Sequence, residues 1–191
     1  MALVTKVKAA NITNLSDARY CAGMGVDWIG FPVKEIDPTR FAEITGWLSG
    51  PQWVIELNEQ PWPSLEDYPV QIWQCASSDF NLALALPGKL MVQLQASEWL
   101  QVSAVLKEHA DRIEAVILTG VLRGDEAKKL IGEIAKYFPV LVDMNSIEAT
   151  LTEILLWPVA GIQLHGSSEE RPGLKDYAQL ADVLEQLETD A

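Results

Sequence analysis

VKAANITNLSDARYCAGMGVDWIGF, residues 7–31, contains the structural unit that the rest of the chain repeats. An apolar run ends in two alanines, a short segment of mixed polarity follows, and a second apolar run comes after two glycines. Asn14 and Asp17 are three residues apart, as the capping residues of a helix are, and Gly23 and Gly25 are typical of a helix end. The stretch therefore predicts a strand, a helix and a second strand.

Short apolar runs of the same kind recur along all 191 residues. They are apolar on both faces, which is typical of strands in a parallel sheet covered on both sides. Eight runs are predicted as strands: residues 3–10, 26–31, 52–57, 69–75, 90–95, 114–120, 139–144 and 160–166. Helical spacing is found between most of them and at the end of the chain, in residues 37–48, 97–110, 124–138, 146–156 and 174–188.

Eight strands that alternate with helices predict the α/β class and a compact (β/α)8 TIM barrel. Residues 58–68 and 76–89 leave room for little more than one helical turn. We therefore expect the helices after strands three and four to be shortened or missing. No linker interrupts the pattern, so residues 1–191 are predicted to form a single domain.

Charge and cysteine content limit the classes of function. The net charge is −13, which argues against nucleic acid and membrane surfaces as partners. Cys21 and Cys75 have no metal-like spacing, so we expect two buried thiols, no metal site and no cofactor. The N-terminus lacks a signal-peptide pattern, and no apolar run reaches the ~20 residues of a membrane span. We expect a cytoplasmic protein, either a monomer or a homodimer.

Both ends of the chain resemble one known family. ITNLSDARYCAGMGVDWIGF (12–31) and the residues before it follow K-I-C-G-I-T-N-x-x-D-A and G-A-D-x-x-G-F, and GIQLHGSSEERPGLKD (161–176) follows G-V-D-V-S-S-G-V-E-x-x-P-G-x-K-D. These are patterns of phosphoribosylanthranilate isomerases. The matching residues are Lys8, Ile12, Thr13, Asn14, Asp17, Ala18, Gly25, Asp27, Gly30, Phe31, Gly161, Glu169, Pro172, Gly173, Lys175 and Asp176. The resemblance implies a barrel of tryptophan biosynthesis that binds a small phosphorylated metabolite and catalyses the Amadori rearrangement of N-(5′-phosphoribosyl)anthranilate.

The positions of that family's reacting groups hold other residues. In the family, the Cys of K-I-C-G-I-T is the general base and an Asp at the end of strand six is the general acid. Ala10 takes the place of this Cys, and Thr119 and Gly120 end the sixth strand. Losing one member of an acid/base set costs about 10²–10⁴-fold in rate. The isomerase activity is therefore expected to be weak or absent.

Three binding motifs of the family also differ. The Gly-Gly of strand seven, which holds the substrate phosphate, is Asp143–Met144 here. The Ser-Ser-Gly after strand eight is residues 165–167, and the His-Gly of strand four is Trp73–Gln74. An inward carboxylate at Asp143 would repel a phosphate, and Trp73 is expected to fill part of the substrate cavity.

Asp143 and His165 are the candidate catalytic residues. They end strands seven and eight, which are neighbours in a barrel, and a carboxylate that orients an imidazole is a workable general base. The alternative is structural: Asp143 caps the next helix and His165 packs on the rim. Cys75 ends strand four and is either a displaced acid/base group or a structural thiol.

The candidate ligand-binding residues come from the same strand ends. An inward Lys8 either holds a ligand carboxylate or phosphate or pairs with a buried acid such as Glu56. The segment after strand eight is expected to hold a phosphate on its N–H groups. Arg40, in DPTRF, resembles the family's S-P-R, whose Arg holds the anthranilate carboxylate. The predicted binding residues are Lys8, Asn11, Arg40, Gly166, Ser167 and Ser168.

Three functions are compatible with these residues. The first is an isomerase with substituted catalytic groups. The second is a non-catalytic barrel that binds a phosphorylated metabolite or a protein partner. The third is a different sugar-phosphate or acid/base enzyme that uses Asp143 and His165.

Overall fold

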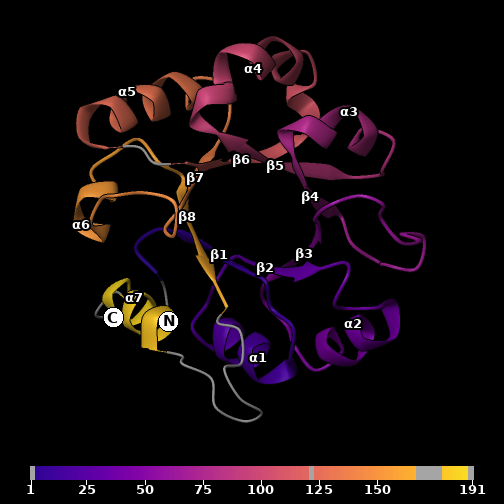
Figure 1. Ribbon diagram of the computed structural model, residues 1–191. Coiled ribbons are helices and arrows are strands. Elements are labelled where there is room, and N and C mark those ends of the chain that lie inside the picture. The colour runs from indigo at the N-terminus through magenta and orange to yellow at the C-terminus, as the bar shows by residue number, and fades with distance from the viewer. Residues whose placement is uncertain (1–2, 121–122, 167–177, 189–191) are drawn as a thin grey trace.

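Eight parallel strands close into a barrel in the order of the sequence, as the strand pattern predicts. The computed structural model describes residues 3–120, 123–166 and 178–188. Figure 1 looks along the barrel, with the helices arranged around the ring of strands. The strands are β1 (Lys6–Ala10), β2 (Trp28–Pro32), β3 (Gln52–Leu57), β4 (Ile72–Ala76), β5 (Lys89–Gln95), β6 (Ile113–Thr119), β7 (Val140–Asp143) and β8 (Gly161–His165).

The ring closes where β8 pairs with β1, from Lys6 opposite Gly161 to Ala10 opposite His165. Gly161 is required at this junction, because a Cβ there would lie 2.2 Å from the carbonyl oxygen of Lys6. The predicted (β/α)8 barrel is confirmed.

The helices differ in length around the ring. The α-helices are α1 (Leu15–Gly23), α2 (Pro38–Thr45), α3 (Phe80–Ala83), α4 (Trp99–Glu108), α5 (Gly124–Ile134), α6 (Leu151–Ile154) and α7 (Ala178–Gln186), with 3-10 turns η1 (Ser77–Asp79), η2 (Ala96–Glu98) and η3 (Ala110–Arg112). No helix occurs in residues 58–71, all of which are described, and α3 has only four residues. The expected loss or shortening of helices after β3 and β4 is therefore confirmed.

Capping side chains determine where the helices begin. The Asn14 side chain accepts from the Asp17 N–H at the start of α1, and the Asp37 side chain accepts from the Arg40 N–H ahead of α2. Thr150 and Glu153 form a reciprocal capping box. This box starts α6 at Leu151, so the prediction of a helix from residue 146 is wrong at its N-terminal end.

Two apolar regions lie on opposite sides of the strands. The inner one fills the barrel with Trp28, Val54, Ile72, Met91, Ala115, Ile117 and Leu141. The larger outer one lies between the strands and the helices and includes Trp73 and Cys75. Trp73 is packed in this outer region and its Nε1 donates to the Pro87 carbonyl at 2.8 Å. The expectation that Trp73 fills the substrate cavity is therefore wrong, because its side chain leaves β4 on the face opposite to Ile72.

No helix in the described part of the chain is long and apolar enough to cross a membrane.

Candidate functional site

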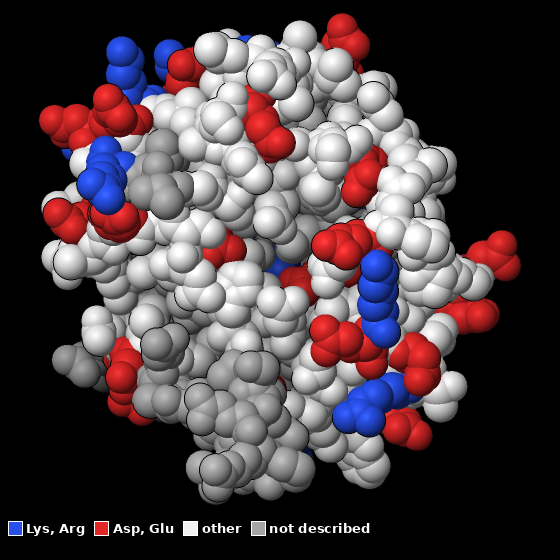
Figure 2. Space-filling view, viewed as in Figure 1, with Lys and Arg blue, Asp and Glu red and all other residues white. Residues whose placement is uncertain are grey.

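The carboxyl ends of the strands form the mouth of the barrel, where active sites of this architecture are built. Val7 and Ala9 of β1 belong to the outer core, so Lys8 and Ala10 share the inward face. Ala10 and Thr119 therefore end two strands at the mouth, and neither has a group that transfers protons at neutral pH. Seen along the barrel, acidic and basic atoms lie side by side in a hollow at its centre (Figure 2).

Asp143 and His165 meet at this mouth. His165 Nε2 lies 2.6 Å from Asp143 Oδ2, and the Asp143 side chain is 4% exposed against 24% for His165. Asp143 Oδ2 also accepts from Gln163 Nε2 at 2.7 Å, and Oδ1 accepts from the Asn145 N–H at 2.9 Å. The Asp143 carboxylate thus binds both His165 and the turn after β7. It does not cap the next helix, because the N-cap of α6 is Thr150.

The environment of Asp143 keeps it ionised. Burial raises the pKa of its carboxyl, but the hydrogen bond and charge of His165, with the bonds from Gln163 and Asn145, outweigh burial and lower the pKa below its ordinary value. An ionised carboxylate can only accept, so His165 Nε2 carries the proton of this bond. The 3.3 Å approach of Gln163 Nε2 to His165 Nε2 is then a contact between two donors that share one oxygen.

Asn11 faces the other ring nitrogen of His165. Its Nδ2 lies 3.1 Å from His165 Nδ1, and with Nε2 protonated this nitrogen accepts the hydrogen bond. The backbone of Asn11 has a positive φ of 56°, which Asn adopts more readily than most residues. The family pattern has Gly at this position, so Asn11 adds a side chain to the mouth and keeps the left-handed turn.

A buried ion pair supports this arrangement from below. Lys8 Nζ lies 2.5 Å from Glu56 Oε1 and donates to Gln163 Oε1 at 3.1 Å, and the exposed fractions of the Lys8 and Glu56 side chains are 0% and 2%. Glu56 Oε2 accepts from the Asn11 N–H at 3.0 Å. Lys8 therefore forms the pair with Glu56 that the sequence offered as the alternative to ligand binding.

Thr119 and Cys75 supply no acid/base group to the mouth. Thr119 donates its hydroxyl to the Leu94 carbonyl at 3.2 Å. Burial, with a smaller contribution from the charge of Asp79, raises the pKa of the Cys75 thiol to about 12. Cys75 is thus a structural thiol. Among the described residues, no group of three or more His, Cys, Asp and Glu side chains could hold a metal ion.

The predicted phosphate and carboxylate contacts are only partly described. The Gly166 N–H donates to the Ala10 carbonyl at 2.8 Å and continues the β1–β8 pairing, so this amide is not available to a phosphate. Ser167 and Ser168 lie outside the described residues. Arg40 is exposed in the first turn of α2, and its Nη2 donates to the Thr13 carbonyl at 3.3 Å.

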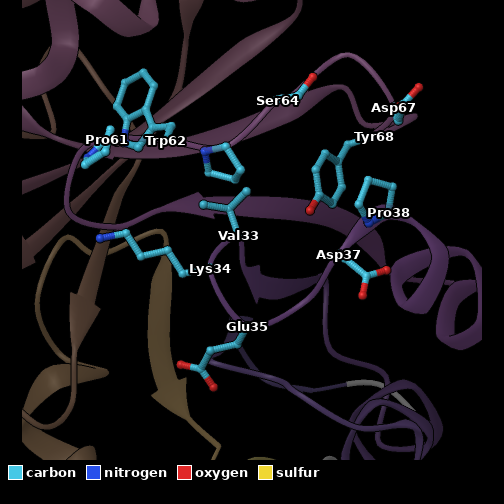
Figure 3. A pocket seen from close by; sticks show the side chains of 11 residues that line it. Val33, Lys34, Glu35, Asp37, Pro38, Pro61, Trp62, Ser64, Asp67 and Tyr68 are labelled. Atoms are coloured by element: carbon cyan, nitrogen blue, oxygen red, sulfur yellow. The ribbon is translucent and has the colours of Figure 1, made fainter.

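Two of the described cavities are lined by residues at or after the carboxyl ends of strands β2 to β5, and neither is lined by Asp143 or His165. One of about 860 Å³ is bounded by the β2–α2 loop and the helix-free segment after β3, where Trp62 and Tyr68 contribute aromatic walls (Figure 3). A second, of about 340 Å³, lies over the ends of β3, β4 and β5 and includes Gln74 and Gln93.

Sequence reasoning missed Gln163, which links Lys8 to Asp143. The available signal was its spacing: Gln163 is two residues before His165 and therefore on the same face of β8.

The comparisons with known proteins concern the fold. The sequence matches no protein-family profile and no curated protein. The crystal structure of phosphoribosylanthranilate isomerase from Thermus thermophilus is similar with a TM-score of 0.69, at 21% identity, over 95% of this chain and 98% of that one. The corresponding isomerase from Pyrococcus furiosus has a TM-score of 0.63, at 15% identity, with 96% and 98% covered.

A barrel with a different activity is equally similar in shape. A truncated 3-deoxy-D-arabino-heptulosonate 7-phosphate synthase from Thermotoga maritima has a TM-score of 0.66, at 14% identity, with 95% of this chain and 84% of that one covered. At such identities the likeness defines the architecture and leaves the reaction open. The chain has the (β/α)8 fold found in phosphoribosylanthranilate isomerases.

Proposed function

We propose that this chain is an acid/base enzyme of the isomerase-type barrel whose proton-transfer group is the Asp143–His165 pair. The observation that supports this proposal most directly is the 2.6 Å contact between His165 Nε2 and Asp143 Oδ2 at the mouth of the barrel. Its substrate is a small polar metabolite, of which a sugar or sugar phosphate is the class that the fold favours. Turnover of N-(5′-phosphoribosyl)anthranilate is absent or very weak.

The loss of isomerase chemistry follows from two positions. Ala10 has no group that could remove the C2 proton of the substrate. In the family a carboxylic acid at the end of strand six protonates the ring oxygen, whereas the Thr119 hydroxyl at this position donates to a backbone carbonyl. The loss of each group lowers the rate about 10²–10⁴-fold. With both groups missing, the barrel contributes only binding and orientation of the substrate to the reaction. The carboxylate of Asp143, where the family has Gly-Gly, further disfavours a phosphate at that strand end.

The Asp143–His165 pair supplies a different proton-transfer group. Asp143 orients the imidazole and stabilises the positive charge that forms when His165 Nδ1 takes a proton. Nδ1 is the nitrogen that faces Asn11, and the Asn11 side chain is exposed. A substrate that displaces the Asn11 amide therefore reaches the base directly. A positioned base of this kind contributes about 10²–10⁴-fold to a proton transfer.

One observation favours a second function. The Asn11 amide occupies the nitrogen that catalysis needs, which suits a barrel that binds a metabolite without turning it over. In that case the Asp143–His165 pair only holds the side chains at the mouth of the barrel in place.

Two assays test these functions. The first follows conversion of N-(5′-phosphoribosyl)anthranilate by chromatography, with the Thermus thermophilus isomerase as the positive control; we expect no product above background. The second follows uptake of solvent deuterium at the carbon next to the carbonyl group, which is C2 of an aldose and C1 of a ketose, in a panel of small aldoses, ketoses and their phosphates by proton NMR. We expect exchange with at least one compound, loss of exchange in His165→Gln and Asp143→Asn, and no change in His109→Gln.

His109→Gln is the matched control, because His109 is the chain's second histidine and lies at the end of α4, away from the mouth. Turnover of N-(5′-phosphoribosyl)anthranilate at a rate near that of the Thermus thermophilus isomerase would contradict the proposal. So would deuterium exchange that persists in His165→Gln. Exchange with no compound of the panel would favour the non-catalytic barrel.

A further inference from the structure

The cavity over the ends of β3, β4 and β5 contains a buried polar atom without a partner. Its volume is about 340 Å³, and its polar lining comes from the loop after β3, from η1 and from the inward faces of β4 and β5. The polar lining residues are Asn58, Glu59, Gln74, Ser78, Asp79 and Gln93.

Gln74 forms the buried part of this lining. The residue is 6% exposed, and its Nε2 donates to Gln93 Oε1 at 3.2 Å. Its Oε1 is buried and has no hydrogen-bond partner among the described residues. A buried carbonyl left unpaired costs about 1–3 kcal/mol, so such atoms usually mark a place where another molecule donates. Exchanging the oxygen and nitrogen of the Gln74 amide would set its oxygen against Gln93 Oε1, which is also an acceptor.

The same lining is negatively charged. Glu59 and Asp79 contribute two carboxylates, and no Lys, Arg or His is among the described residues that line the cavity. Asp79 Oδ1 accepts from Gln60 Nε2 at 2.6 Å, which leaves its second oxygen to other donors. The cavity therefore offers acceptors and negative charge, which together favour a cationic donor and disfavour phosphate and carboxylate groups.

The geometry points to a binding subsite for a protonated amine, with the ammonium group between Gln74 Oε1 and the carboxylates of Glu59 and Asp79. An ammonium group has three N–H donors and a full positive charge, which matches one orphan acceptor and two carboxylates. Gln74 lies opposite Glu56 in the register of β3 and β4, so the subsite is at the carboxyl ends of the strands, the same end of the barrel as Asp143 and His165. This subsite concerns binding alone and stands whether or not the Asp143–His165 pair transfers protons.

Glucosamine and glucose form a matched pair of probes, because they have the same ring and differ by an ammonium group in place of a hydroxyl. Each is titrated at pH 6, where the amine is protonated, into the full-length ¹⁵N-labelled protein while the side-chain amides are followed by NMR. We expect glucosamine to shift the Gln74 amide with a dissociation constant in the millimolar range and to bind at least about tenfold more tightly than glucose, as charge-assisted hydrogen bonds require. Inorganic phosphate is expected not to shift it.

Variants separate this subsite from the rest of the mouth. Gln74→Leu and Glu59→Gln are each expected to weaken glucosamine binding at least about fivefold, because each removes an acceptor or a charge. Gln71→Leu, the same change on an exposed residue just before β4, is the control and leaves the affinity unchanged. His165→Gln also leaves it unchanged, which distinguishes a failure of this inference from a failure of the proposed function.

Gln74→Leu is expected to fold, since an apolar side chain of similar size relieves an unpaired buried carbonyl, and thermal unfolding checks this. Equal affinities for glucose and glucosamine would overturn the inference. The same holds for a Gln74→Leu protein that binds glucosamine as the unmodified chain does. Absence of any Gln74 shift with saturating glucosamine would also overturn it.

Discussion

Gly30→Ala tests the buried ion pair on which the mouth of the barrel rests. Gly30 lies in the middle of β2 and faces the barrel interior. A Cβ at this position would lie 2.1 Å from Glu56 Oε1 and 2.7 Å from Lys8 Nζ. Real Cβ atoms do not approach other atoms so closely, so the pair has to separate or move. Both side chains are almost fully buried, and water cannot replace the lost contact.

The expected cost follows from two known effects. Removing one partner of a buried pair costs about 3–5 kcal/mol, and inserting a methyl group into a packed interior costs about 1–3 kcal/mol. Because alanine displaces the pair without deleting a charge, we expect the free energy of unfolding to fall by about 3 kcal/mol. For a chain of this size that corresponds to a decrease of about 1 M in the urea midpoint.

Urea unfolding followed by circular dichroism measures this change. Gly23→Ala is the control, because a Cβ at the end of α1 would have no neighbour within 4 Å; we expect that protein to be unchanged or slightly more stable. In a Lys8→Met/Glu56→Leu background, Gly30→Ala is expected to cost less than about 1 kcal/mol, since the clash is with the pair itself. If Gly30→Ala were as stable as the unmodified chain, or if its full cost persisted in that background, the clash with the Lys8–Glu56 pair would not be the cause.

Three further predictions concern single side chains of the mouth and the outer core. The pKa of the Asp143 carboxyl is lowered by its partners, so its contribution is complete above the unfolded value of about 3.9 and is lost as the pH falls through the native value. In urea titrations Asp143→Asn is therefore expected to lower stability by about 2 kcal/mol at pH 7 and by progressively less as the pH falls below the unfolded value of about 3.9, and a loss that does not change with pH would contradict this. With a pKa of about 12, the Cys75 thiol is expected to react with a thiol reagent at pH 8 only as fast as the protein unfolds, and rapid labelling of the native protein at Cys75 would oppose it. Ala10→Cys restores one group of the isomerase set, and turnover of the aminoribose phosphate is expected to stay at background because Thr119 supplies no acid.

The periodicity of the sequence predicted the architecture well. Strands of a doubly covered barrel are continuously apolar, and the eight runs stand out for that reason. The contact between Asp143 and His165 was also predictable, because residues that end adjacent strands lie close together at one end of the barrel.

What the sequence left open has a physical cause in each case. A run that is apolar on both faces does not show which residues point inward, so the outward direction of Trp73 could not be known before β4 was placed. The positive φ of Asn11 and the bond from its N–H to Glu56 depend on a residue 45 positions away. The use of the Gly166 N–H in strand pairing likewise depends on how far β8 extends along β1.

The proposed chemistry depends on His165, whose Nε2 carries a proton held by an ionised Asp143 and whose Nδ1 is then the base. Nitrogen-15 NMR of the imidazole rings measures this directly, with His109→Gln to assign the two histidines. For the neutral ring we predict a proton on Nε2 and a bare Nδ1, and a changed Nε2–H signal in Asp143→Asn. A neutral ring with its proton on Nδ1, or ring signals that Asp143→Asn leaves unchanged, would contradict this assignment.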